Sequence, residues 1–137
     1  MENTNNILNE NPNPVKQRHG CVTAWLVLII VLNSVVAFLY LLRGSWIAEH
    51  LPGGISTGMI TLLGLLCILN IVFAVMLFQW KKWGFWGVIV TDVIAFIINL
   101  SIGLSIVQSA LGLLGIGVLY AILQIKQGSK SAWENME

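Results

Sequence analysis

The sequence predicts an all-α fold: a polytopic membrane protein whose four transmembrane helices form a bundle with both termini cytoplasmic. Three observations carry this prediction: the composition, the length of the apolar runs, and a short basic turn between two of them. Of the 137 residues, 57% are hydrophobic and 9% are charged, whereas about a quarter of the residues of a soluble domain are charged. Most of the surface must therefore face something other than water.

Residues 20–125 contain enough apolar sequence for four crossings, because a bilayer core about 30 Å thick takes about 20 helical residues. Runs this continuous lack the alternation of a membrane β-strand, which leaves helices as the spanning form. Residues 1–18 are rich in Asn and have little to bury, so they are predicted to be a disordered cytoplasmic tail. The bundle is expected at 19–125, with helices at about 21–42, 58–80, 83–100 and 107–125.

The first apolar run follows Lys16 and Arg18, as in a secretory signal. It is too long for one, and no small-residue cleavage site closes it, so an uncleaved first helix is expected. The connection after it, 43–58, is the one loop of any size. Within this loop Ser45–Leu51 fits one or two helical turns lying in the membrane interface, which Pro52–Gly54 would end.

A short basic turn separates the second and third expected helices. The run Trp80–Trp86 has two lysines flanked by three tryptophans, and this pattern predicts a cytoplasmic turn with aromatic rings at the headgroup level. One helix over 83–125 would extend about twice the thickness of the bilayer core, so a reversal is expected at Ser101–Ser105, where the turn residues are. Residues 126–137 are expected to form a cytoplasmic tail, with Trp133 resting against the inner headgroups.

The distribution of basic residues predicts the orientation. With both termini in the cytoplasm, six basic residues lie on the inner side and only Arg43 lies on the outer side. The reverse arrangement would contradict the positive-inside rule. The six are Lys16, Arg18, Lys81, Lys82, Lys126 and Lys130.

Asp92 is the only Asp, Glu, Lys, Arg or His within the four expected spans. It lies about 13 Å past Trp83 along its helix, close to the midplane. Asn33 and Asn70 fall near the centres of the first two helices, and Asn99 shares a helix face with Asp92, so we expect these residues to form an intramembrane polar layer. An ionised Asp at the bilayer centre costs about 2.5–3.5 kcal/mol, so Asp92 should face the bundle interior. A neutral carboxyl there would donate to an Asn carbonyl.

Small residues let neighbouring helix backbones approach closely in a membrane. They gather on one face of each of the last three helices, and we expect these faces to contact one another while Leu, Ile and Val face lipid. The stripes are Gly64, Cys67, Asn70 and Ala74 on the second helix, Asp92, Ala95 and Asn99 on the third, and Ser105, Ser109, Gly112 and Gly115, with Gly117 nearby, on the fourth.

The sequence leaves three roles open for Asp92. A structural role would fix helix pairing, at about 0.6–2 kcal/mol per interhelical hydrogen bond. A proton or cation relay is the second, since intramembrane carboxylates often mark ion pathways, although a relay usually needs another titratable group and the spans contain no Lys, Arg, His or Glu. Contact with another subunit is the third.

No residue pattern indicates an enzyme. Cys21 and Cys67 lie far apart without a C-x-x-C motif, and His19 and His50 are expected on opposite sides of the bilayer, so neither a redox pair nor a nucleophile–base set is formed. No catalytic, cofactor-binding or metal-ligating residue is predicted, and no cofactor is expected. A net charge of +1 gives no reason to expect nucleic acid.

Three stretches are familiar in combination: Trp80–Trp86, Ala95–Leu100 and Lys130–Glu134. Together they resemble a group of small uncharacterised bacterial four-helix integral membrane proteins, over about residues 21–134. The resemblance implies the bacterial cytoplasmic (inner) membrane as the location and implies nothing about activity.

The expected function is that of a small non-enzymatic integral membrane protein, an accessory or self-associating bundle. Its expected partners are the lipid bilayer and either a second copy of the chain or another membrane protein. A small transporter or channel subunit that uses Asp92 is the alternative. A membrane immunity or stress protein is compatible with the same sequence, although no residue points to it.

Overall fold

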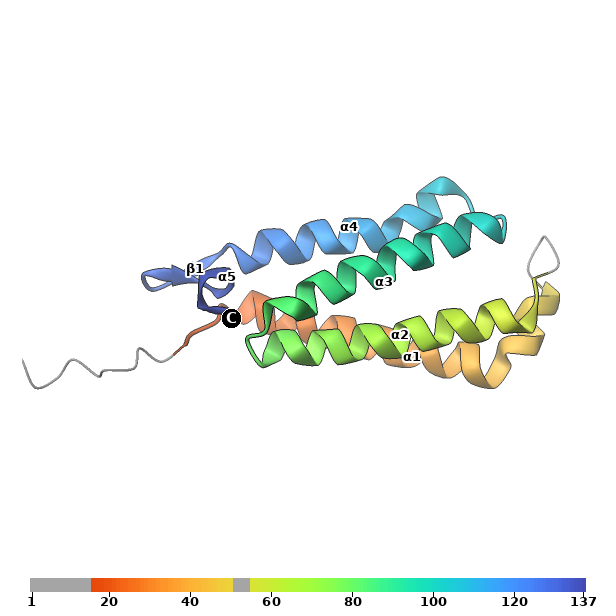
Figure 1. Cartoon of the computed structure of the whole chain (residues 1–137), viewed down its shortest axis with the longest axis horizontal. Coiled ribbons are helices and arrows are strands. Elements are labelled where there is room, and N and C mark those ends of the chain that lie inside the picture. Colours follow the sequence, from red (N-terminus) through yellow and green to blue (C-terminus); the bar gives the residue numbers. More distant parts are fainter. Residues whose placement is uncertain (1–15, 51–54) are drawn as a thin grey trace, which may run out of the picture.

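The computed structural model describes residues 16–50 and 55–137. Four long helices run along the same axis (Figure 1): α1 (Gly20–His50), α2 (Thr57–Phe78), α3 (Lys82–Ser101) and α4 (Ile106–Leu123). A two-stranded antiparallel hairpin, β1 (Lys126–Gln127) with β2 (Lys130–Ser131), and the short helix α5 (Ala132–Asn135) follow. Each of the four long helices is long and apolar enough to cross a membrane. The predicted all-α chain with four helices of spanning length is confirmed.

The first helix differs most from its expected bounds. α1 continues past Arg43, where the backbone kinks (φ −119°, ψ 18°), and ends at His50. The turns expected within the 43–58 loop are therefore an extension of α1 beyond a kink. Ala48 on this extension is buried in the same cluster as Ile60 of α2, so packing over the end of α2 keeps the chain helical there. The tail predicted at 1–18 lies mostly outside the described residues, as does the stop predicted at Pro52–Gly54.

Two apolar clusters fill the bundle, one toward each end. Figure 1 shows the start of α1, the α2–α3 turn and the C-terminus together at one end, which we call the basic end because Lys16, Arg18, Lys81, Lys82, Lys126 and Lys130 lie there. Its cluster consists of Val22, Leu26, Leu77, Phe85, Val88, Leu119, Leu123, Ala132 and Met136. The cluster of the opposite end consists of Ala48, Ile55, Ile60, Leu63, Leu66 and Ile102.

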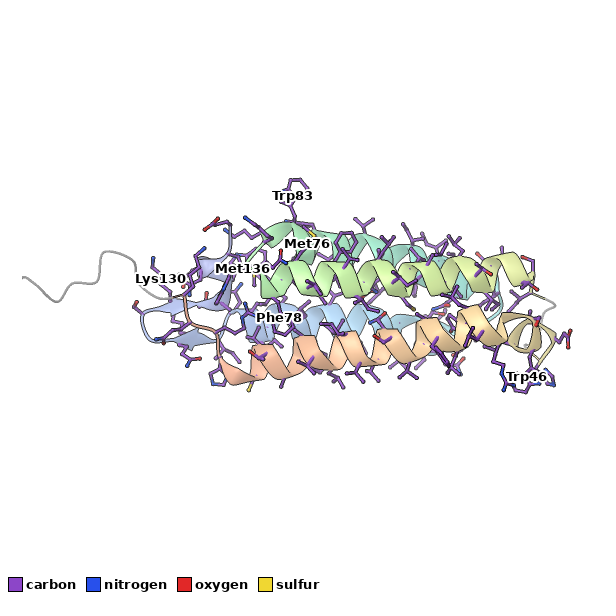
Figure 2. The ribbon with its side chains drawn as sticks, turned by 90° about the horizontal axis from the view of Figure 1, so that it is seen from below. Trp46, Met76, Phe78, Trp83, Lys130 and Met136 are labelled. Carbon is purple, nitrogen blue, oxygen red and sulfur yellow. The ribbon has the colours of Figure 1, made fainter. Side chains whose placement is uncertain are left out.

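Apolar side chains also cover the outside of the bundle. Phe38 of α1 exposes 65% of its surface and Val107 of α4 exposes 75%, which suits lipid and would be unfavourable in water. Trp83 and Trp46 project outward toward opposite ends of the helical bundle (Figure 2). Tryptophan favours the two membrane–water interfaces, so these two residues mark the limits of the apolar belt.

The α2–α3 turn is the basic turn expected from the sequence. After α2, Trp80 adopts a left-handed conformation (φ 63°), which glycine usually supplies at a helix C-terminus. The Lys81 N–H donates to the Met76 carbonyl (3.0 Å) and closes the helix end. The Arg18 guanidinium donates to the Phe78 carbonyl (2.7 Å), and its carbon lies 4.3 Å from the centre of the Trp80 ring. Burial lowers the pKa of Arg18. The chain before α1 therefore caps α2 and holds Trp80 in place.

The segment expected as a tail at 126–137 folds back onto the bundle. Ala132 and Met136 are buried in the cluster of the basic end. Trp133 packs edge-on against Phe85, with 5.2 Å between the ring centres, so its indole lies on α3, where the sequence led us to expect headgroups. We call residues 126–137 the C-terminal cap.

Glu137 fastens the C-terminal cap to the α2–α3 turn. Its N–H donates to the Trp80 carbonyl (2.8 Å), and the Lys82 N–H donates to the Glu137 carbonyl (2.7 Å). Its carboxylate pairs with Lys16, and the Lys81 ammonium lies 3.7 Å away. The hydrogen bond from Lys16 and the charges of both lysines lower the pKa of the Glu137 carboxyl. The two described ends of the chain and the central turn thus meet at one point.

Glycine serves opposite purposes in α3 and α4. A Cβ on Gly84 would lie 2.5 Å from the Phe73 carbonyl oxygen, and one on Gly87 would lie 2.3 Å from the Phe73 ring, so these glycines let α3 approach α2. A Cβ on Gly112 or Gly115 of α4 would meet nothing within 4 Å. The prediction that the α4 glycines make close contacts is therefore wrong, because the α4 backbone approaches α3 far more closely than it approaches α1.

The contrast between these glycines is testable. Gly84→Ala should destabilise the bundle by roughly 1–3 kcal/mol, because the new methyl group collides with backbone and α2 and α3 must separate. Gly112→Ala should be neutral or stabilising by up to about 1 kcal/mol, through helix propensity alone. Unfolding of both variants in mixed detergent micelles measures the difference. Equal stability of the two would contradict the close approach of α2 and α3.

Candidate functional site

A hydrogen bond joins α2 to α3 between the two apolar clusters. The Asn70 side-chain N–H donates to Asp92 Oδ1 at 2.7 Å. The Thr91 hydroxyl donates to the Asn70 side-chain carbonyl. Asn70 and Thr91 are buried, exposing 8% and 3% of their surfaces. Both ends of the Asn70 amide are therefore used, and the amide has one fixed orientation.

The direction of this hydrogen bond is the reverse of the one expected. We expected a neutral Asp92 carboxyl to donate to an Asn carbonyl, whereas the structure has the Asn70 amide donating and Oδ1 of Asp92 accepting. Thr91 is the reason, because its hydroxyl occupies the carbonyl oxygen of Asn70. Sequence reasoning missed Thr91. The only feature of the sequence that could have indicated a role for Thr91 is its neighbour Asp92. A Thr in the middle of a helix normally donates its hydroxyl to a carbonyl of its own helix, and Thr91 also lies 3.0 Å from the Gly87 carbonyl.

The remaining two residues of the expected polar layer are placed differently. Asn33 of α1 lines the same cavity as Asn70 and Asp92, but its amide donates to the Ile29 carbonyl of its own helix (2.9 Å). Asn99 lies in a neighbouring cavity of about 170 Å³, which Asn33 and Asn70 also line. The structure thus brings Asp92, Asn70 and Asn33 around one space and sets Asn99 beside a second.

The first cavity has a volume of about 250 Å³ and takes walls from all four long helices. Asp92, Asn70 and Asn33 form its polar part, and Trp25 lies in its wall. The Trp25 indole N–H is buried and has no hydrogen-bond partner among the described residues. Apolar side chains and two glycines complete the lining: Leu28, Ile29, Leu32, Val88, Leu111, Gly112, Gly115, Ile116 and Leu119.

Asp92 has no cationic partner in the part of the chain that the structure describes. There, both ion pairs are made by Glu137 at the basic end. The described residues also contain no group of three or more His, Cys, Asp and Glu close enough to bind a metal ion. Cys21 and Cys67 are both free thiols. The charge of an ionised Asp92 is therefore met only by the Asn70 amide.

Comparisons with protein families, with curated proteins and with solved structures find no match to this chain. The resemblance to small bacterial membrane proteins therefore stays a prediction. Any function has to be inferred from the side chains of the chain itself.

The contribution of Thr91 can be measured with a matched pair of substitutions. Thr91→Val keeps the shape of the side chain and frees the Asn70 carbonyl, so we expect a loss of about 0.6–2 kcal/mol in unfolding free energy. Thr61→Val removes a hydroxyl that bonds only the Thr57 carbonyl of its own helix and should change little. Unfolding in detergent micelles checks both, and equal effects would show that the Thr91–Asn70 bond adds no stability.

Proposed function

We propose that the chain is a small non-enzymatic membrane protein that acts by associating, through α4, with a second copy of itself or with another membrane protein. The observation that carries the proposal is an open face on α4. Gly117 and Ala121 are both exposed on this face and lie four residues apart, the small-xxx-small spacing at which membrane helices pack. A Cβ on Gly117 would meet nothing within 4 Å.

This open face points away from the rest of the bundle. Gly117 lies two residues from both Gly115, in the cavity wall, and Leu119, which is fully buried. Two residues along a helix lead to the opposite side, so Gly117 and Ala121 face outward. Because apolar side chains gain little from leaving lipid, helix association in a membrane depends on such close packing. A second helix is the occupant that a small-residue face suits.

We place the chain in the bacterial cytoplasmic (inner) membrane as a multi-pass protein with both termini in the cytoplasm. The gathering of six basic residues at one end of the bundle supports this orientation. Lys16 and Glu137 pair at that end, so the two described ends of the chain lie on one side. Arg43 lies at the kink of α1, toward the other end.

A small transporter or channel subunit is the second candidate. The observation that favours it is the position of Asp92 in the wall of a cavity that all four helices share. Intramembrane carboxylates often mark ion or solute pathways. The spans expected from the sequence (21–42, 58–80, 83–100 and 107–125) contain no second Asp, Glu, His, Lys or Arg, which counts against a proton relay.

Single cysteines test the orientation. In a background carrying Cys21→Ser and Cys67→Ala, a membrane-impermeant maleimide should label Glu49→Cys in intact cells. Lys130→Cys should be labelled only in inverted membrane vesicles, because the basic end faces the cytoplasm. Labelling of Lys130→Cys in intact cells would contradict the proposed orientation.

Two variants test association through α4, each with one exposed alanine replaced by isoleucine. Ala121→Ile should weaken self-association at least about tenfold, equivalent to about 1.4 kcal/mol, because the branched side chain keeps helices apart. Ala24→Ile on α1 is the matched control and should leave association unchanged. Energy transfer between labelled copies in lipid vesicles, followed as the protein is diluted in lipid, gives the affinity. A chain that is monomeric at every dilution, or equal effects of both variants, would reject self-association through α4.

A further inference from the structure

We propose that the cavity beside Asp92 binds a small organic cation, an ammonium group carried on a compact apolar body. The proposal goes beyond the association proposed above and does not depend on it. Three properties of the cavity support it: a carboxyl group with no cationic partner among the described residues, a largely apolar lining with an indole, and space left open by glycine.

The carboxylate supplies the charge. Asp92 Oδ1 accepts the Asn70 N–H, while no described residue donates to Oδ2 and no described cation pairs with Asp92. Because Thr91 holds the carbonyl of Asn70, the amide can offer Asp92 only its N–H, so Oδ1 of Asp92 acts as an acceptor. Ionising a buried carboxyl group that has no cationic partner is costly. A cationic guest that pairs with the carboxylate offsets that cost.

The lining selects an organic cation over a metal ion. A cation such as Ca²⁺ takes 6–8 oxygen ligands, and this cavity offers one carboxylate and two Asn side chains, one of which already has its oxygen occupied. Most of the wall is aliphatic, and Trp25 adds an indole. An ammonium group is attracted to the face of an indole, and Trp is the best aromatic partner for it.

The size of the cavity fits a guest with a single ring. An engineered apolar cavity of about 150 Å³ accommodates benzene, and the cavity beside Asp92 has about 250 Å³. The additional volume suits one substituted ammonium group. The backbones of α1 and α4, which form most of the wall, come close at few points, so a guest that has partitioned into the membrane can enter between them.

Gly112 and Gly115 keep this space open. Both line the cavity, and a Cβ on either would meet nothing within 4 Å. Any longer side chain there would project toward the guest. Gly117, on the same helix, is equally open but does not line the cavity. The two kinds of α4 glycine therefore provide a matched pair for an experiment.

The test uses radiolabelled benzyltrimethylammonium as the probe, with the full chain reconstituted in phosphatidylcholine nanodiscs, whose zwitterionic lipid does not attract cations. We expect saturable binding in a scintillation proximity assay. Excess neopentylbenzene, the neutral analogue of the same shape, should not displace the probe. Absence of saturable binding at millimolar probe, or displacement by neopentylbenzene as efficient as by unlabelled benzyltrimethylammonium, would overturn the proposal.

Three variants locate the probe. Asp92→Asn should weaken binding at least about tenfold, since an ion pair in a low-dielectric site is lost. Gly115→Leu should abolish binding by filling the cavity, and Gly117→Leu should bind as the wild type does. Size-exclusion elution and helical circular dichroism check folding, and if Asp92→Asn does not fold, the two glycine variants decide alone. Wild-type affinity in Gly115→Leu would place the probe elsewhere and overturn the proposal.

The same variants separate this proposal from the proposed association. If α4 mediates association, Gly117→Leu weakens energy transfer between copies while probe binding persists. Gly115→Leu does the reverse. Loss of one property without the other therefore shows which of the two proposals has failed.

Discussion

The hydrogen bond between Asn70 and Asp92 fixes how α2 and α3 align along the bundle. In lipid, apolar side chains gain little by choosing one neighbour over another, so polar contacts and close backbone packing decide the alignment. A slip of one turn would separate Asn70 from Asp92 in a region without water to replace the lost bond. Gly84 and Gly87 act with this bond, because they let α3 come close enough to α2 for it to form. The two apolar clusters then fall on either side of the polar layer.

The fold was predicted from the lengths of the apolar runs and from the residue types at their ends. Four apolar runs gave four helices, and the lysine–tryptophan run and the Ser101–Ser105 stretch gave two reversals. Helical turns were predicted at Ser45–Leu51, but their continuity with α1 was not, because Arg43 and Ser45 look like the end of a span. What keeps that segment helical is contact between Ala48 and α2, which is tertiary packing. The local sequence does not indicate that contact.

The same limit applies to the polar layer and the glycines. Depth along the helices predicted that Asp92, Asn70 and Asn33 would share one region, since depth follows from counting residues. The orientation of the Asn70 amide could not be predicted, because it depends on the Thr91 hydroxyl. That hydroxyl can also donate to the Gly87 carbonyl of its own helix. The sequence does not distinguish Gly84 from Gly115. Whether a glycine makes a close contact or leaves a space depends on the helix packed beside it. A single sequence does not state which helices are neighbours.

The C-terminal cap has a consequence for how the protein is assembled. The bonds of Glu137 with Trp80 and Lys82, and the burial of Met136, join the segment after α4 to the turn between α2 and α3. These contacts can therefore form only once all four long helices have been synthesised. The hydrogen bond between Asn70 and Asp92 needs only α2 and α3, so it can form earlier. Closure of the basic end is therefore a late step in the assembly of the bundle.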